Sequence, residues 1–418
     1  MQRADNELIC RVEPDTPMGD VFRRYWTPIA VAEQLDKPDG DPVRVRFAGA
    51  DYVAFRDSDG KLGLLDELCC HRGASLALGR NEEGGLRCLY HGWKLATDGA
   101  LLEAPNHPDG KLRELVKAPA YPIRQAGATI WGYFGPPEKE PPFPDYPFMS
   151  QPEEEIYTAR YDLNCNYLQL IEGGFDSSHV GILHSDMARP GWKTNNFTQA
   201  DDTNNPGALA VDDLNPELSM ERTDFGFHYA ALRKAENGAK SVRIVPFIMP
   251  SVRIIPARER MAWIFEVPRD SEHTSTYLVA HGAYTSDKVR NRHMSGVDDP
   301  NLWSEEDFKW RGSWENNFGQ DRSLMNESWT GMRGLEQEDA AMTLSMGPIY
   351  DRTLEHLVAA DGAVVEMRRV LLDAARGMAE GKDPLGLPSL AGVAAVVDTD
   401  IQPGGRWQDL APGNKAAV

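Results

Sequence analysis

The sequence is poor in the features that mark secreted, membrane-spanning and nucleic-acid-binding chains. It has five cysteines in 418 residues, an odd number that does not suit a disulfide framework. It has no run of about twenty apolar residues and no apolar stretch near its N-terminus that would act as a signal peptide. Basic residues are also scarce, because 64 acidic residues face 44 basic ones and leave a net charge of −20. We therefore expect a cytoplasmic protein with neither nucleic acid nor a membrane as a partner.

Two of the cysteines belong to the most informative stretch, which contains Cys69, His71, Cys88 and His91. Two thiolates and two imidazoles can hold a single zinc ion. They can also hold a Rieske [2Fe–2S] cluster, with both cysteines on one iron and both histidines on the other. Zinc fingers usually pair Cys with Cys and His with His, whereas each half-motif here is mixed, Cys-x-His and Cys-x-x-His. The mixed pairs favour the Rieske cluster, and structural zinc is the alternative.

The pattern of the chain changes after this stretch. Residues 40–135 alternate in short strand-like segments with Asp-Gly turns, which predicts a small all-β module. The proline-rich segment Pro136–Pro144 predicts a stiff, extended linker. We expect three parts: an N-terminal segment 1–39 that packs with the larger domain, a metal-binding module at 40–140, and a larger domain at 141–418.

The larger domain reads as α+β, with strands followed by helices. We expect a helix through Leu170–His184, and a late helix that Asp361 caps and whose apolar positions recur with helical spacing. The strands between them have the spacing of one antiparallel sheet. They are Phe225–Leu232, Val242–Met249, Val252–Ile255, Met261–Val267 and Thr274–Ala283.

A second set of possible metal ligands lies in the predicted helix Leu170–His184. Asp176 and His179 are three residues apart and share one helix face. His184 is five residues further on, about 140° round an ideal helix, so the histidines converge only if the helix is irregular or ends between them. Two imidazoles and a carboxylate form the facial triad of non-haem iron(II) oxygenases. The alternative is a surface aspartate and two structural histidines.

The two motifs together, CxHRG-x14-CxYHGW and a downstream Asp-x-x-His-x4-His, resemble the Rieske non-haem iron aromatic-ring oxygenases, α subunit. The segments Glu172–Gly174 and Met346–Arg352 resemble the phthalate dioxygenase branch, which includes aromatic O-demethylases. The resemblance implies a small all-β Rieske domain joined to a catalytic domain with a curved antiparallel sheet and helices, of the helix-grip or START-like type. It also implies a homotrimer or a pair of stacked trimers.

The resemblance implies roles for individual residues. His179, His184 and a late aspartate would bind a mononuclear Fe(II); that aspartate matches Asp339, and Glu336 is the fallback. Asp176 resembles the family's bridging aspartate, which would link His91 of one subunit to His179 of the next. Cys70 stands where the family often has proline, at a position that is not a ligand.

The implied activity is that of a terminal oxygenase, with O₂ as co-substrate. The chain has no GxGxxG fingerprint for a nicotinamide or flavin, so electrons from NAD(P)H would arrive through a separate ferredoxin or ferredoxin reductase. Arg243 matches a family arginine that binds the substrate carboxylate, and Ser178 is a second candidate substrate contact.

The expected reaction is O-demethylation or hydroxylation of an aromatic carboxylate, with a slight preference for demethylation of a lignin-derived methoxylated or biaryl acid. Three alternatives stay open: a phthalate-type ring dioxygenase, an oxygenase of a non-aromatic or N-methyl substrate, and an electron-transfer or zinc-stabilised binding protein.

Overall fold

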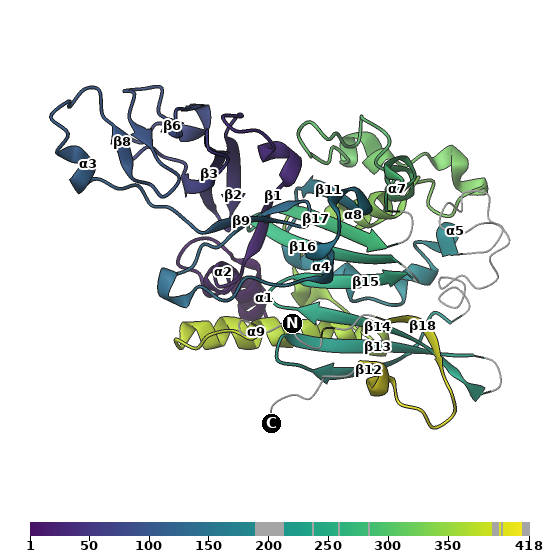
Figure 1. Cartoon of the computed structure of the whole chain (residues 1–418). Helices are drawn as coiled ribbons and strands as arrows, with labels where there is room; N and C mark the ends of the chain where they lie inside the picture. The colour runs from purple at the N-terminus through teal and green to yellow at the C-terminus, as the bar shows by residue number, and fades with distance from the viewer. Residues whose placement is uncertain are drawn as a thin grey trace.

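A computed structural model describes residues 1–188, 213–235, 238–257, 260–282, 285–386, 393 and 396–411. These residues form four sheets, and every pairing between their strands is antiparallel. In Figure 1 the strands from β2 to β8 form a lobe that projects at the upper left, while the large sheet occupies the centre and right. The fold class expected from the sequence, an all-β module beside an α+β domain, is confirmed.

Two small sheets build the lobe. The first has the order β2-β3-β4 and the second the order β5-β6-β7-β8. Val45 and Phe47 of β2 point into the core, and the alternating Arg44 and Arg46 point outward to an ion pair with Asp51. The strands are β2 (Val43–Phe47), β3 (Ala50–Arg56), β4 (Leu62–Asp66), β5 (Arg80–Glu82), β6 (Gly85–Arg87), β7 (Lys94–Leu95) and β8 (Leu101–Glu103), and the short helix α3 (Leu112–Leu115) follows them.

The N-terminal segment contacts both parts of the molecule. Its helices α1 (Arg3–Cys10) and α2 (Pro17–Arg23) pack against the late helix α9 (Gly362–Ala379). Its strand β1 (Thr27–Val31) pairs with β10 (Thr129–Gly132), which pairs in turn with β9 (Ile123–Ala126). The segment therefore joins the end of the β-module to the helices of the larger domain.

The large sheet has the strand order β11-β17-β16-β15-β14-β13-β12, with β18 also paired to β14. All five predicted strands are present, and β11, β12 and β18 were not predicted. The strands are β11 (Ile156–Leu163), β12 (Glu217–Arg222), β13 (Gly226–Lys234), β14 (Lys240–Ile248), β15 (Val252–Ala257), β16 (Arg260–Asp270), β17 (His273–Gly282) and β18 (Val396–Ile401).

The two faces of this sheet have different neighbours. The register pairs Phe247 with Arg253, and Arg253 with Ile264, so these side chains share one face. That face carries α4 (Tyr167–Gly174), because Arg253 donates to the carbonyl oxygen of Leu170 at 3.3 Å. The opposite face packs against the β1-β10-β9 sheet through Trp131 and Phe265, whose ring centroids are 5.3 Å apart.

Two predictions about helices and one about the linker need correction. The predicted helix Leu170–His184 is not continuous: α4 ends at Gly174, a short 3-10 turn spans His179–Gly181, and α5 (Ser185–Ala188) follows. Asp361 precedes α9, but its side chain accepts from the backbone N–H of Val358 and makes no hydrogen bond to the helix.

The Pro136–Pro144 linker is less extended than predicted. A 3-10 turn occupies Pro137–Lys139, and the carbonyl oxygen of Pro141 accepts from the Trp26 indole at 3.1 Å. The linker is thus partly packed onto the core.

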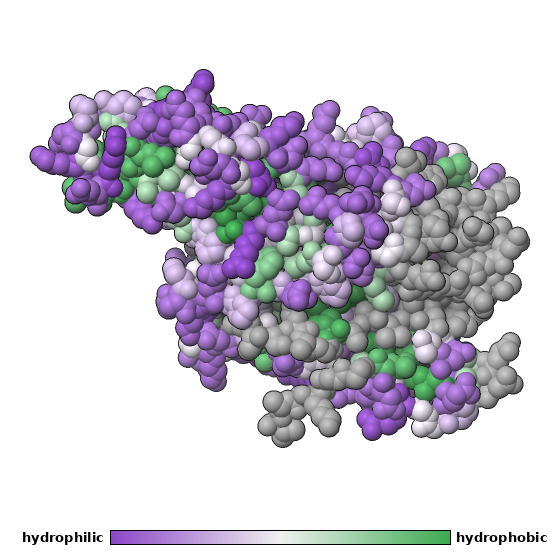
Figure 2. Space-filling model, viewed as in Figure 1, coloured by the Kyte–Doolittle hydropathy of each residue, from purple (hydrophilic) through white to green (hydrophobic). Residues whose placement is uncertain are grey.

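The surface of the lobe includes exposed hydrophobic side chains. Figure 2 shows hydrophobic atoms on the lobe among hydrophilic ones. Leu68, Leu78, Leu89 and Tyr90, in the segments around the Cys/His motif, are 58–73% exposed. No helix in the described part of the chain is long and apolar enough to cross a membrane.

Candidate metal centres

The two halves of the Cys/His motif form loops with the same backbone hydrogen bonds. The N–H of Cys69 donates to the oxygen of Ala74, and the N–H of Gly73 donates back to the oxygen of Cys69. In the second loop the N–H of Cys88 donates to Trp93 and that of Gly92 donates back to Cys88. Gly73 and Gly92 have φ of +72° and +75°, a conformation that favours glycine. The Cys-x-His loop and the Cys-x-x-His loop therefore have the same backbone turn, each closed by a glycine.

The four ligand side chains on these loops differ in burial. The thiols of Cys69 and Cys88 are buried, whereas His71 and His91 are half-buried, with ring centroids 4.5 Å apart. The His71 ring stacks on Trp93 at 4.4 Å and 8°. The paired sulfurs thus lie inside the lobe and the paired imidazoles nearer its surface.

This arrangement fits a two-iron cluster better than one zinc ion. Ligand atoms of a tetrahedral zinc, about 2.0–2.3 Å from the ion, lie within about 4 Å of one another. Among the described residues, only His179, His184 and Asp339 bring three such atoms within 4.8 Å of one another. The four Cys/His ligands are spread more widely, as expected when two cysteines bind one iron and two histidines the other.

The second site forms where α4 stops. A Cβ at Gly174 would lie 2.0 Å from Cδ of Arg253, so only glycine allows the helix end to approach the sheet this closely. The chain then turns away from the helix axis before His179, which brings the rings of His179 and His184 to 5.1 Å. The break in the helix removes the angular mismatch expected on a regular helix.

Asp339 completes this second site from α8 (Leu335–Ser345). Its Oδ1 lies 3.8 Å from Nε2 of His179 and 3.2 Å from Nε2 of His184. The site contains Asp339 and not the fallback Glu336. Two imidazole nitrogens and one carboxylate oxygen thus face a common point, which is the donor set of a non-haem iron(II) site.

The electrostatics of the site favour a cation. Burial alone would lower the pKa of His184. The carboxylates of Asp339 and Glu338 have the larger effect and raise this pKa to about 10. Burial raises the pKa of Asp339, but the imidazoles of His184 and His179 lower it to about 2. These carboxylates and imidazoles thus favour positive charge at the point that they face, which a bound divalent cation would supply.

Each histidine of this site also faces a carboxylate with its Nδ1. The Nδ1 atom of His179 lies 3.5 Å from Asp176, whose other oxygen accepts from the N–H and hydroxyl of Ser178. The Nδ1 atom of His184 lies 2.7 Å from Glu338. The structure thus places Asp176 beside the site and the Ser178 hydroxyl on Asp176; Glu338, which sequence reasoning did not single out, lies on the opposite flank.

Arg243 lies on the sheet face that carries the site. The register pairs Arg243 with Ala231 on β13. Tyr229 and Arg233, two residues to either side of Ala231, share its face of the sheet. Arg233 donates to the oxygen and the hydroxyl of Ser177 at 3.1 Å, so this face contacts the loop that leads to His179. The Nε atom of Arg243 is buried and has no hydrogen-bond partner. A guanidinium donor therefore remains available near the candidate site.

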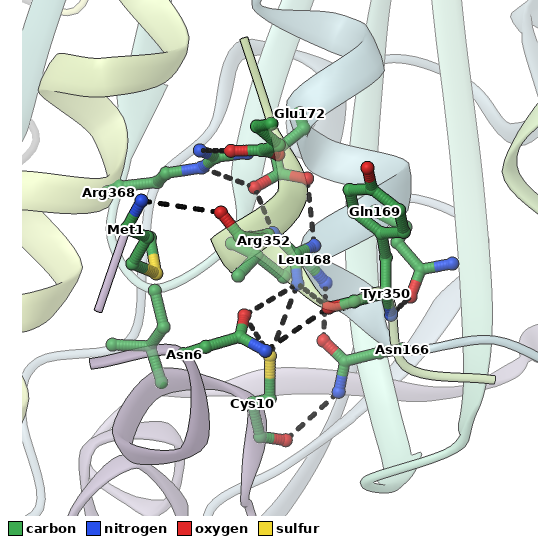
Figure 3. A network of polar contacts seen from close by, with 12 residues as sticks. Met1, Asn6, Cys10, Asn166, Leu168, Gln169, Glu172, Tyr350, Arg352 and Arg368 are labelled. Carbon is green, nitrogen blue, oxygen red and sulfur yellow. Dashed lines mark hydrogen bonds and ion pairs between the residues drawn. The ribbon is translucent and has the colours of Figure 1, made fainter. Parts of the chain in front are cut away.

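A buried ion-pair network anchors the helix that leads into the site. Figure 3 shows Arg352 between Glu172 of α4 and Asn6 and Cys10 of α1, with Arg368 also bonded to Glu172. Glu172 accepts from Arg352 at 2.7 and 2.8 Å and from Arg368 at 2.6 Å. Burial raises the pKa of Glu172, but the two guanidinium groups lower it more. The last turn of α4 is thus tied to α9 and to the segment after α8.

Two family models match successive parts of the chain. Residues 25–122 match the Rieske [2Fe-2S] domain, and residues 132–399 match the family described as LigXa C-terminal domain like.

Among curated proteins, the phthalate 4,5-dioxygenase oxygenase subunit of Pseudomonas putida is 38% identical, covering 97% of this chain and 93% of that protein. The 5,5'-dehydrodivanillate O-demethylase oxygenase subunit of a Sphingobium species is 28% identical, covering 91% and 81%. The 3-chlorobenzoate-3,4-dioxygenase oxygenase subunit of Comamonas testosteroni is 32% identical, covering 89% and 88%.

Solved structures show the same fold. Dicamba monooxygenase bound to dicamba aligns with a TM-score of 0.58 at 17% identity, covering 86% of this chain and 99% of that one. The oxygenase in a reduced complex with ferredoxin, from carbazole 1,9a-dioxygenase, aligns at 0.55 and 17%, covering 90% and 96%. With both family models matched in order along the chain, the protein belongs to the Rieske non-haem iron oxygenases, as an oxygenase subunit of the phthalate dioxygenase-like branch.

Proposed function

We propose that His179, His184 and Asp339 bind the mononuclear Fe(II) at which an aromatic carboxylate is hydroxylated or O-demethylated. The convergence of these three ligand atoms within 4.8 Å is the observation that carries this proposal. When bound, the Rieske cluster supplies single electrons and the Fe(II) supplies open coordination positions for O₂ activation. The protein's own contribution is to orient the imidazoles, hold the substrate and separate the two centres.

The cluster ligands proposed are Cys69, His71, Cys88 and His91. Within one chain they lie on the projecting lobe, away from α4, α5 and α8 (Figure 1). We propose that electrons therefore cross between subunits of a homotrimer or of two stacked trimers. Asp176 would form the bridge, accepting from His91 of one subunit and from His179 of the next. Its side chain is 27% exposed, which leaves it accessible to a neighbouring subunit.

Electrons would reach the cluster from NAD(P)H through a separate ferredoxin or ferredoxin reductase. An oxygenase–ferredoxin complex is known for the carbazole 1,9a-dioxygenase system, whose oxygenase shares this fold. We propose a cytoplasmic location, because NAD(P)H supplies the electrons.

Arg243 is the proposed carboxylate-binding residue. Its unpartnered Nε and its place on the site-facing side of the sheet support this role, since guanidinium groups form charge-assisted bonds with carboxylates. The sequence preference was for O-demethylation, but the relative that is 38% identical is a dioxygenase of phthalate. Phthalates are therefore the first substrates to test, and methoxylated or biaryl acids the second.

The iron site can be tested by metal analysis. We expect about three irons and two acid-labile sulfides per chain in the wild-type protein. Asp339→Ala should lose one iron and its turnover while keeping the visible spectrum of the cluster, whereas Glu336→Ala should keep all three irons. One zinc and no sulfide per chain would refute the oxygenase assignment.

The reaction can be tested with the purified protein and a surrogate reductase. O₂ uptake, formaldehyde release and dihydroxylated product would be measured with phthalates, vanillate-like acids and biaryl acids. O₂ consumption that is coupled to a dihydroxylated product favours the dioxygenase, and stoichiometric formaldehyde favours the demethylase. Arg243→Gln should raise KM for a carboxylate substrate much more than for its methyl ester; an equal effect on both would contradict the role of Arg243.

A further inference from the structure

We propose that Glu338 is a positioning residue that fixes the ring of His184 at the iron site and slows the release of iron. The inference rests on the proposed iron site, and it assigns a role to a buried glutamate beside it. Glu338 is 2% exposed and His184 is 6% exposed, so neither side chain is hydrated as a surface pair would be.

The hydrogen bond selects one form of the imidazole. The Nδ1–H of His184 can donate to Oε2 of Glu338 at 2.7 Å, a short distance typical of charge-assisted bonds. A neutral imidazole has only one N–H, so the donor position at Nδ1 leaves a lone pair on Nε2. The Nε2 atom of His184 faces Asp339 at 3.2 Å, on the side where the metal would bind. Glu338 therefore presents His184 to the metal in the correct tautomer.

Glu338 is itself held in place by a second hydrogen bond. Its Oε1 accepts from the hydroxyl of Thr330 at 2.7 Å, and Thr330 is 7% exposed. The hydroxyl of Thr330 also accepts from the N–H of Met332. The Glu338 side chain is thus fixed at both oxygens and cannot rotate away from His184 without breaking a buried bond.

The loop that carries Thr330 is tied back to the segment that carries His184. The hydroxyl of Ser328 donates to Asp186 at 2.7 Å, and the N–H of Trp329 donates to the same carboxylate at 2.8 Å. Asp186 lies two residues after His184 on α5 and is buried. The path from His184 through Glu338 to Thr330 is therefore hydrogen-bonded, and the chain beside Thr330 is bonded in turn to Asp186, two residues after His184.

The other iron histidine is held differently. His179 lies 3.5 Å from Asp176, whose side chain is 27% exposed and whose partners come from its own loop. Glu338 is enclosed by the same chain, so it cannot contact a second subunit in the way proposed for Asp176. We therefore infer a division of roles, in which Asp176 serves electron transfer and Glu338 serves iron retention.

The experiment measures how fast ferrozine removes the mononuclear iron from the purified holoenzyme. The variants are Glu338→Ala and the near-isosteric Glu338→Gln. Glu336→Gln is the matched control, because it removes an acidic charge from the same helix. We expect Glu338→Ala to release iron about 10–100-fold faster than wild type, and Glu336→Gln to match wild type. The EPR spectrum of the ferrous nitric oxide complex should change in Glu338→Ala and not in the control.

Thr330 variants protect the test against simple misfolding. Thr330→Val keeps the shape and removes the hydroxyl, so iron release should accelerate by a smaller factor, and Thr330→Ser should restore the wild-type rate. The visible spectrum of the cluster should be unchanged in every variant. Iron release from Glu338→Ala at the wild-type rate, with an unchanged nitric oxide spectrum, would overturn this inference alone. A wild-type protein that binds no third iron would refute the iron site itself, and this inference with it.

Discussion

The two proposed metal centres share histidine ligands but are built in different ways. The cluster loops are short, and the backbone hydrogen bonds of Cys69 and Cys88 repeat from one loop to the other. The proposed iron site joins His179 and His184 to Asp339 on a distant helix, and the buried Glu338 holds the ring of His184. The first centre depends on turn geometry and the second on burial of charge. Substitutions should therefore affect the two centres independently.

The largest effect is expected from the ligands of the cluster. Cys69→Ser should abolish the cluster, because Cys69 is buried and provides one of its two thiolates. About two irons and both sulfides per chain should be lost, together with the visible absorbance. Cys70→Ser is the control, since its thiol is exposed and is not part of the ligand set. Loss of the cluster in Cys70→Ser, or its retention in Cys69→Ser, would contradict the ligand assignment.

The next effect separates electron transfer from metal binding. Asp176→Asn should lower turnover about 100-fold while both centres stay occupied, because an amide keeps the shape but is a weaker acceptor for two imidazoles. Rapid reduction and single-turnover measurements would show a reduced cluster that does not deliver electrons. Full activity with normal coupling to the donor would refute the bridging role.

A smaller effect tests the buried anchor of α4. Glu172→Gln leaves Arg352 and Arg368 buried without their shared carboxylate, and we expect a loss of about 3–5 kcal/mol in the free energy of unfolding. Urea denaturation followed by intrinsic fluorescence measures this loss. The control Glu7→Gln breaks an exposed pair with Arg11 and should cost less than about 1 kcal/mol. Equal effects of the two substitutions would show that the network does not support the fold.

The smallest effect concerns an ion-pair group beside the cluster. Hydrogen bonds from Lys94 and Arg87 lower the pKa of Glu103 to about 2. Because the folded-state pKa lies below the unfolded value, this stabilisation is present above about pH 4.5 and is lost as the pH falls toward 2. The side chain is 37% exposed, so its contribution is about 0.5–1 kcal/mol.

Glu103→Gln should remove that pH dependence. Thermal denaturation followed through the cluster absorbance would show a difference between variant and wild type at pH 7 that shrinks as the pH approaches 3. A difference that grows in acid would reverse the sign expected from the lowered pKa.

The sequence predicted the cluster site more directly than the iron site, because the ligands of the cluster are close together in the chain and those of the iron site are not. The Cys69–His91 ligands are close in the chain, so their spacing and glycines identified the site directly. Asp339 lies 160 residues after His179, and no periodic pattern connects them; only the family resemblance suggested it. Glu338 was overlooked, although a glutamate next to a candidate ligand and followed by Ala340 and Ala341 could have suggested a buried carboxylate.

The fold was predicted where alternation is strong and missed where tertiary contacts decide. The five central strands followed from their apolar patterns, whereas β18 is a late segment whose pairing with β14 no local pattern reveals. The helix predicted over Leu170–His184 stops at Gly174, a position where Arg253 leaves no space for a side chain. The effect of Arg253 on Gly174 depends on the strand register, which the local sequence does not contain.

The distance along the chain between the ligands has a consequence for how the protein matures. The cluster loops can close as soon as the first 103 residues have emerged, because β2 to β8 pair among themselves. The iron site needs α8, which follows the seven strands β11 to β17 in the chain. Because contacts between distant segments form late, we expect cluster assembly to precede iron loading. Newly made protein should then be coloured and reducible before it holds its final metal.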